Sequence, residues 1–326
     1  MQNNHHHTGA RRAFSTKSAA ALCTGLIAAC LLGGMTACSS NEDKQKMQTQ
    51  ASRAEQRRAD SLALKVAVTP TTDCLPLYVA KERGLFDEQG VAVSLKCKQS
   101  HIDCDQAMLE GKVEMMASDL MRTERLIHNG LPLTYVTSTN AYWQLIGNRL
   151  SRVRKVDQLG DKMMGMSRYS ATDYLGTLAV DSAKPKLPVF RIQINDVDVR
   201  LKMLTNNEID AVLLTEPQAT AARMQRHNVL FDSRHRDIAL GVLAIRTKAV
   251  DDARIRQQRD AFVKAYNLAC DSINQRGIAA YADVLKKYCH VDDSIIARLP
   301  KMEFRHAAQP RTADVERTKN VKWKTF

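Results

Sequence analysis

Short apolar runs alternate with helical patterns along the chain from residue 64 onward. The first three runs with the length of buried strands are 64–68, 91–95 and 113–117. Between the first two, the segment 76–83 is typical of a short helix, because Pro76 suits a first turn and Gly84 suits a helix end. Strands that alternate with helices predict an α/β fold with a mainly parallel sheet.

The alternation restarts after Gly160 and ends in two long helical patterns near the C-terminus. The strand patterns of this second stretch are 162–166, 189–194, 210–214 and 241–245. Breaks near 150–158 and 232–240 indicate a lobe that is inserted between two halves of another lobe. A single doubly wound sheet is compatible with this length, but the breaks favour two lobes, with the chain crossing between them twice.

The first 37 residues are typical of an export signal. Arg11, Arg12 and Lys17 make the start positive, residues 19–34 are apolar and small, and a small residue precedes Cys38. This is the three-part pattern of a secretory signal, and its apolar run is shorter than the about 20 residues that a membrane-spanning helix needs. The position of Cys38 resembles the lipidated cysteine of bacterial lipoproteins.

We expect residues 1–37 to be removed as a signal peptide and Cys38 to carry a lipid. Residues 38–63 are polar and have few apolar positions, a composition typical of a tether. The protein is therefore expected to be a lipoprotein of the cell envelope that faces the periplasm and is anchored in a membrane.

Composition narrows the classes of function. Hydrophobic residues make up 44% and charged residues 25%, which is ordinary for a globular protein. The formal net charge is +13, but Lys and Arg are scattered and aromatic residues make up only 5%, so we expect no nucleic-acid binding. A solvated face or attraction to anionic lipid headgroups accounts for this charge. No C-x-x-C motif occurs, and we expect neither a metal nor a cofactor.

Five cysteines follow Cys38, and outside the cytoplasm thiols tend to pair. Because five is odd, at least one should be free. Cys270 and Cys289 lie in neighbouring helical patterns and are the favoured disulfide. Cys97 and Cys104 lie close in sequence and could form a second pair.

Four short motifs of the body resemble, in order and spacing, those of periplasmic solute-binding proteins of the sulfonate, taurine, nitrate and thiamine-precursor group. The clearest is AKERGLF at 80–86, which matches the A-K-E-x-G-[YL]-F pattern that ends their first helix. The others are EGKVE at 110–114 with Ser118, VDQLGDK at 156–162, and NEIDAVLLTEP at 207–217. Glu114 stands where that family more often has Asp.

The resemblance implies a two-lobed, Venus-flytrap binding protein with a mainly parallel sheet in each lobe. Lobe 1 would comprise 64–150 and 240–326, and lobe 2 would comprise 151–239. Such a protein is expected to act as a monomer that traps a small sulfonate, zwitterion or nitrogen heterocycle between its lobes. Its partner would be the permease of an ABC importer, which recognises the closed form.

The residues themselves point to the same cleft, because ligands of open parallel sheets bind beyond the carboxyl ends of strands. The residues expected to bind ligand are Thr72, Asp73, Ser118, Asp119, Ser138, Ser170, Thr172, Tyr174, Thr215 and Glu216. Two opposed helix N-termini, at Ser118 and Ser170, would suit a small anion.

Each of these residues also has a structural role open to it. Ser118 and Ser170 would cap helices in any protein, and Asp73 would cap a loop. Tyr174 lies on one helix face and belongs either to the core or to the cleft. Glu216 either accepts a hydrogen bond from the ligand or braces the hinge, and the first role would favour a ligand with an N–H or cationic group.

Two other classes of function compete with transport. Cys74 with His101, His128 or His290 could form a thiol–imidazole pair, but no spacing supports it and no G-x-S-x-G elbow occurs, so we expect no enzyme. A lipoprotein of the same fold that senses a solute or binds another protein remains the alternative.

Overall fold

The computed structural model describes residues 45–46 and 61–319 of the chain. The chain divides into two compact units, 1–52 and 53–326, and the fold described below belongs to the second. The predicted signal peptide, Cys38 and most of the predicted tether lie outside the described residues. Among the residues described, no helix is both long and apolar enough to cross a membrane.

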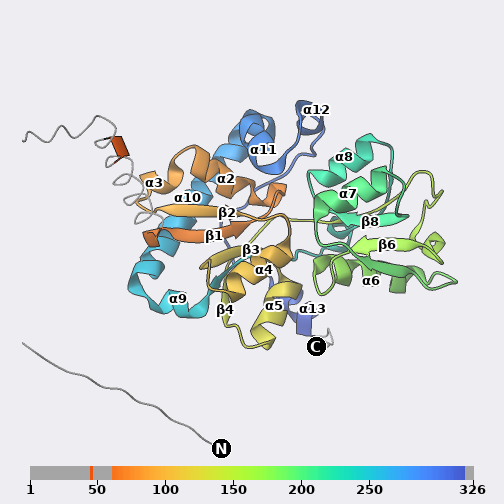
Figure 1. The fold of residues 1–326 in the computed structure, drawn as a ribbon, viewed down its shortest axis with the longest axis horizontal. Coiled ribbons are helices and arrows are strands. Elements are labelled where there is room, and N and C mark those ends of the chain that lie inside the picture. Colours follow the sequence, from red (N-terminus) through yellow and green to blue (C-terminus); the bar gives the residue numbers. More distant parts are fainter. Residues whose placement is uncertain (1–44, 47–60, 320–326) are drawn as a thin grey trace, which may run out of the picture. The chain divides into compact units, whose positions relative to one another are not determined.

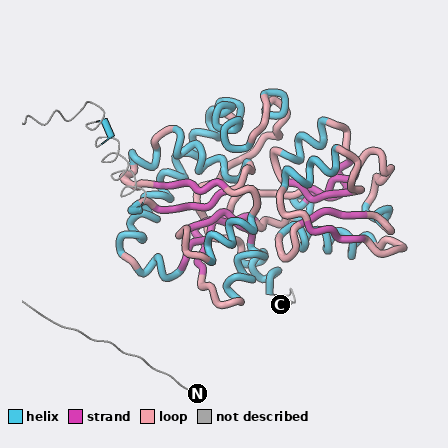
Figure 2. The backbone as a smooth tube through the Cα atoms, viewed as in Figure 1, coloured by secondary structure: helices cyan, strands magenta, loops and turns pink. Residues whose placement is uncertain are grey.

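The strands of the second unit form two five-stranded sheets (Figures 1 and 2). The first sheet has the order β2-β1-β3-β10-β4. Its strands are β1 (Leu64–Val68), β2 (Val93–Cys97), β3 (Met115–Asp119), β4 (Leu133–Ser138) and β10 (Gly241–Arg246). β1 pairs in parallel with β2 and β3, whereas β10 runs antiparallel between β3 and β4.

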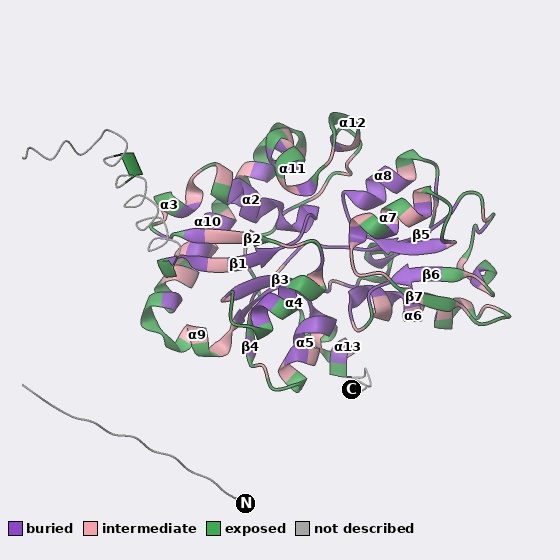
Figure 3. Cartoon of the chain, viewed as in Figure 1, coloured by how far each residue is buried: buried purple, intermediate pink, exposed green. Residues whose placement is uncertain are grey.

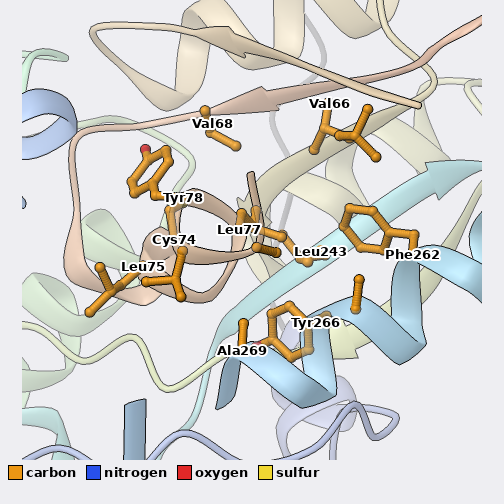
Figure 4. Packing of buried hydrophobic residues seen from close by; sticks show 14 of the residues in the cluster. Val66, Val68, Cys74, Leu75, Leu77, Tyr78, Leu243, Phe262, Tyr266 and Ala269 are labelled. Carbon is orange, nitrogen blue, oxygen red and sulfur yellow. The ribbon is translucent and has the colours of Figure 1, made fainter. Parts of the chain in front are cut away.

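Alternate side chains of β1 enter two different cores, as the two-residue period of a strand requires. Val66 and Val68 pack against α2, α10 and α11, and Ala67 packs against α4 and α5. Figure 4 shows Phe262 and Tyr266 of α10 close to Leu77 of α2. These helices are α2 (Leu75–Glu82), α4 (His101–Leu109), α5 (Leu120–His128), α10 (Ala253–Arg276) and α11 (Ala282–Cys289). The shorter helices of this half are α3 (Leu85–Glu88), α9 (Thr247–Asp251), α12 (Asp293–Ile296) and α13 (Thr312–Lys319).

The second sheet has the order β7-β6-β8-β5-β9. Its strands are β5 (Gln144–Gly147), β6 (Met163–Met166), β7 (Phe190–Gln193), β8 (Ala211–Leu214) and β9 (Asn228–Asp232). One face carries α6 (Ala171–Ala183), and the other carries α7 (Val197–Thr205) and α8 (Gln218–Met224). Figure 3 shows the contrast between the buried inner strand β5 and the largely exposed edge strand β7.

The predicted two-lobed α/β fold is confirmed, and both sheets prove to be mixed. In each sheet four strands share one direction and one strand opposes them, β10 in the first and β5 in the second. These are the strands that the chain enters directly after crossing from the other sheet. Because a crossing delivers the chain to the cleft edge of the sheet, the strand that follows runs away from the cleft and against its neighbours.

The first crossing lies earlier than the sequence indicated. The pattern placed the end of the first stretch near residue 150, but β5 pairs with β8 and β9 of the second sheet, so the chain crosses at 139–143. It returns at 233–240. At Gly241, where the chain enters β10, the two crossings touch so closely that a Cβ there would clash with Thr139 Oγ1 and with Ala141 Cβ.

The favoured disulfide between Cys270 and Cys289 is wrong. All five cysteines of the described body are free thiols. Cys270 and Cys289 are buried in the core that α10 and α11 share, and burial raises the pKa of Cys270 to about 12. The apolar core thus holds them as small protonated side chains, which is a common role of cysteine. The alternative pair fails as well, because Cys104 is buried under β1 while Cys97 is exposed at the end of β2.

Candidate ligand-binding cleft

A cavity lies between the two sheets, and both contribute residues to its wall. The residues that line it are Thr69, Thr71, Gln99, Ser100, His101, Asp119, Arg122, Trp143, Ser167, Ser170, Thr172, Asn195, Val197, Arg200 and Thr215. Apart from Trp143, which directly precedes β5, they lie at or after the carboxyl ends of β1, β2, β3, β6, β7 and β8, where ligands of open α/β sheets bind. The cavity volume is about 20 Å³, which holds about one water molecule.

The small volume reflects direct contact between the lobes. Arg122 of α5 donates from Nη2 to Ser167 Oγ on the opposite wall. The backbone N–H of Thr72 donates to the carbonyl oxygen of Glu216 at 2.9 Å, and Gln218 Nε2 donates to the carbonyl oxygen of Pro70 at 3.1 Å. The two lobes are therefore in direct contact at these points.

Arg200 is a buried cation that forms no ion pair with another described residue. It lies in α7 with 5% of its surface exposed, and it lines the cavity. Nε donates to the carbonyl oxygen of Leu213 at 2.9 Å, and Nη1 donates to the carbonyl oxygens of Ile194 and Asn195. Within residues 61–319 it forms no ion pair. Burial, with Arg122 second, lowers the pKa of Arg200 to about 10, while the charges of Asp196 and Asp198 act in the opposite direction. The guanidinium therefore stays positive at neutral pH.

Arg122 is the second buried cation, but acids accompany it. Nη1 contacts Asp105 Oδ2 at 2.6 Å, and Nε lies 3.8 Å from Asp119 Oδ2 without a hydrogen bond. Burial raises the pKa of Asp119 to about 6, although Arg122 acts in the opposite direction. His101 lies on the same wall, and burial, aided by Arg122 and Arg200, lowers its pKa to about 3. His101 is therefore neutral at physiological pH, and Arg200 is the cation of the wall that forms no ion pair with another described residue.

Four of the residues predicted to bind ligand line this cavity: Asp119, Ser170, Thr172 and Thr215. Ser170 caps α6 as predicted, since its Oγ accepts from the backbone N–H of Thr172 at 3.0 Å. The same Oγ donates to the carbonyl oxygen of Ser167 at 2.6 Å. This network fixes the start of α6 at the cavity wall, where its free N–H groups favour a negative charge.

The cap that the sequence assigned to Ser118 belongs to Asp119. β3 extends two residues further than predicted, so Ser118 lies inside the strand, and Asp119 Oδ1 accepts from the backbone N–H of Arg122 at 3.0 Å. Ser118 is 2% exposed and does not line the cavity.

The remaining predicted residues lie beside the cavity rather than in its wall. Thr72 belongs to the interlobe contact with Glu216, and Asp73 accepts from Thr139 Oγ1 at 3.2 Å. Tyr174 packs against the hydrophobic core that α6 shares with the second sheet. Ser138 lines a separate cavity at the crossings.

Glu216 is fully buried and holds elements of the second lobe together. Its carboxylate accepts hydrogen bonds from Tyr142 Oη at 2.6 Å, Arg223 Nη2 at 2.7 Å and Thr220 Oγ1 at 2.6 Å. Tyr142 belongs to the first crossing, so the carboxylate ties that crossing to α8. Of the two roles that the sequence left open, this geometry fits the brace.

Sequence reasoning missed both arginines and the polar residues after two strands. The strand-end rule, applied to β2 and β7 as well, would have found Gln99 and Asn195. Arg122 follows Asp119 by three residues on one helical turn, which is a weak signal. Arg200 gives no signal, because its position in α7 suggests an ordinary surface arginine.

Comparison with known proteins agrees with this architecture. A family model described as "NMT1/THI5 like" matches residues 71–271. No curated protein sequence matches the chain. Among solved structures, the alkanesulfonate-binding protein SsuA from Xanthomonas axonopodis pv. citri, bound to MOPS, has a TM-score of 0.65 at 15% identity, with 79% of this chain and 90% of that chain covered.

Two further structures share the fold. The ligand-binding component of an ABC-type import system from Staphylococcus aureus, with zinc bound, has a TM-score of 0.67 at 14% identity and covers 78% of this chain and 89% of its own. The periplasmic nitrate-binding protein NrtA from Synechocystis PCC 6803 has a TM-score of 0.61 at 15% identity, with 72% of this chain and 68% of that chain covered.

Proposed function

Since the chain belongs to the NMT1/THI5-like family of solute-binding proteins, we propose that it captures a small anionic solute between its lobes for an ABC importer. The observation that carries this proposal is Arg200, a buried guanidinium on the cavity wall without a carboxylate partner within residues 61–319. A buried charge is costly unless it is paired. An anionic group on the ligand would supply the missing partner.

The surrounding groups suit a sulfonate or a carboxylate. Ser170 and Thr172 place hydroxyl groups at the start of α6, and Asn195 adds an amide. Asp119 on the same wall would accept a hydrogen bond from an N–H or ammonium group of the ligand. The ligand class is therefore a small sulfonate, a taurine-like zwitterion or an acidic nitrogen heterocycle.

Capture requires an opening and closing of the lobes. The closed cavity admits about one water molecule, so the ligand must bind an open form and then replace contacts such as that of Arg122 with Ser167. Ligand that binds the closed form better shifts the population toward it. The permease would then recognise the ligand-loaded closed form, with no covalent step on this protein.

Titration calorimetry of the purified two-lobed part of the chain tests this proposal. We expect an alkanesulfonate, taurine or a related zwitterion to bind with one site per chain, and to raise the melting temperature by several degrees when present at about 100 times Kd. Neutral analogues of the same size, such as the matching methyl sulfones, should not bind. Equal binding of the sulfones, or no binding by any anion of the panel, would contradict the assignment of Arg200.

We also propose that Cys38 anchors the protein through a lipid. The support is the signal-like pattern of residues 1–37 and the polar stretch 38–63. In cells fed a labelled fatty acid, the wild-type chain should incorporate label and sediment with membranes. Cys38→Ser should lose the label and remain in the soluble fraction, and label retained in that variant would overturn the proposal.

A further inference from the structure

The start of α6 at the cavity wall faces a negative charge that belongs to the protein itself. Asp119 lines the cavity from the first lobe, and the residues on either side of Ala171 line it from the second. Leu120, which follows Asp119, packs in one hydrophobic core with Ala171, the first residue of α6. The backbone N–H of Ala171 faces the Asp119 carboxylate and stabilises its charge.

The sequence places a ligand anion between the starts of these two helices, and the structure places the Asp119 carboxylate there. We propose that Asp119 determines which ligand the cleft accepts: the anionic group of the ligand takes its place at the start of α6, and tight binding requires a second, positive group on the ligand that pairs with Asp119. Since this role depends on the proposed function, it narrows the ligand class of that function to compact zwitterions.

Asp119 stays beside the start of α6 when a ligand arrives. Its Oδ1 caps α5 by accepting from the backbone N–H of Arg122 at 3.0 Å, and the residue is 2% exposed. An anionic group of the ligand at the start of α6 would therefore lie next to this carboxylate. Two neighbouring anions in a buried site repel each other. A positive group of the ligand, close to its anionic group, would remove that repulsion.

The charges around the cavity also favour a ligand without net charge. Arg122 and Arg200 supply two positive charges, and Asp119 and Asp105, which contacts Arg122, supply two negative ones. Arg200 forms no ion pair within residues 61–319, and Arg122 Nε is buried without a hydrogen bond. The anionic group of a zwitterion would find its partners there, and the positive group would find Asp119. A simple anion would leave one negative charge in excess.

This role makes ligand choice depend on pH. Burial raises the pKa of Asp119 to about 6, while Arg122 and the backbone N–H groups of Arg122 and Ala171 act in the opposite direction. The charged and titratable side chains that face Asp119 or share its wall are Asp105 and His101 of α4, Arg122 of α5, Tyr135 of β4 and Arg200 of α7. Asp173 of α6 pairs instead with Arg191. An ammonium group beside Asp119 lowers its pKa and a lone anion raises it, so zwitterions should bind more weakly as the pH falls through this range, and simple anions more tightly.

Calorimetric titration with taurine and 1-propanesulfonate tests the inference, since the second probe carries a methyl group where taurine carries its ammonium group. At about pH 7.5 the wild-type protein should bind taurine at least about tenfold more tightly, because 1-propanesulfonate leaves the buried carboxylate beside an anion without a partner. At about pH 5 the ratio of the two affinities should fall at least about threefold. This pH series needs no variant.

Asp119→Asn should remove both the preference for taurine and its dependence on pH. Asparagine caps helices as well as aspartate does, so the start of α5 keeps its acceptor while the negative charge is lost. Asp252→Asn is the matched control. Asp252 caps α10 by accepting from the backbone N–H of Arg254 at 2.8 Å and does not line the cavity, so this variant should keep the preference of the wild type.

Equal binding of the two probes by the wild-type protein, or an unchanged preference for taurine in Asp119→Asn, would overturn the inference and leave the proposed function intact. Arg200→Met should weaken both probes alike, because they share the sulfonate group. Absence of binding by both probes would also overturn the inference, whereas the proposed function is overturned only if no anion of the panel binds.

Discussion

Arg200→Met is expected to weaken binding of the anionic ligand about 100-fold or more. Removing one partner of a buried charge pair costs about 2–5 kcal/mol of binding free energy, and every 1.4 kcal/mol corresponds to tenfold. Methionine keeps an unbranched apolar chain but removes the guanidinium, which is the cation of the cavity wall that forms no ion pair with another described residue. Calorimetric titration with the tightest-binding anion of the panel measures the change.

The matched control is Lys202→Met, which removes a positive charge from the exposed face of the same helix. Its effect on affinity should be less than about twofold, because exposed charges contribute little. Arg200 also bonds three backbone carbonyls, so Arg200→Met should lose about 1–3 kcal/mol of unfolding free energy. The titrations should therefore be carried out well below the melting temperature of the variant. Unchanged affinity in the folded variant would remove Arg200 from the site.

Glu216→Ala is expected to lower the unfolding free energy by about 3–5 kcal/mol, because breaking a buried ion pair leaves the partner charge uncompensated. The carboxylate is fully buried and accepts from Tyr142, Arg223 and both the hydroxyl and the backbone N–H of Thr220, so four donor groups lose their acceptor together. Urea unfolding followed by circular dichroism measures the loss.

Glu208→Ala is the control, since Glu208 is an exposed carboxylate of the same lobe and should change stability by less than about 0.5 kcal/mol. The pair of variants distinguishes the two roles that the sequence left open for Glu216. A brace lowers stability, whereas a ligand contact would lower affinity and leave stability near that of the wild type. The second outcome would contradict the role that the geometry gives to Glu216.

The overall architecture was largely predictable. It follows from the spacing of apolar residues within each segment and from the order of strands and helices along the chain. Strands such as 64–68 and helix ends such as Gly84, which adopts a φ of +71°, follow from local rules that the surroundings do not override. The sheet to which β5 belongs was not predictable in this way. An apolar run like that of β5 would fit a strand of either lobe. Its sheet is decided only by its pairing with β8 and β9, which lie far along the chain.

The cleft residues that lie at helix starts could be predicted from the sequence. The buried charged residues of the cleft could not. Ser170 and Thr172 were found because a hydroxyl before a helical pattern marks a cap at a strand end. A shift of two residues in β3 moved the neighbouring cap from Ser118 to Asp119. Arg122 and Arg200 were missed because arginine is almost never fully buried, and burial depends on residues distant in sequence.

The central claim is that two lobes close on a small anion, and the distance between spin labels on the two lobes tests it most directly. Labels at Asp87→Cys in α3 and Asp181→Cys in α6 would occupy exposed sites. The labelled protein would carry Cys97→Ser, which removes the one exposed thiol within residues 61–319. Pulsed electron resonance should show a longer-distance population without ligand and a shift to the shorter distance with the tightest-binding anion of the panel. A single distance that stays the same while that anion binds would contradict the account.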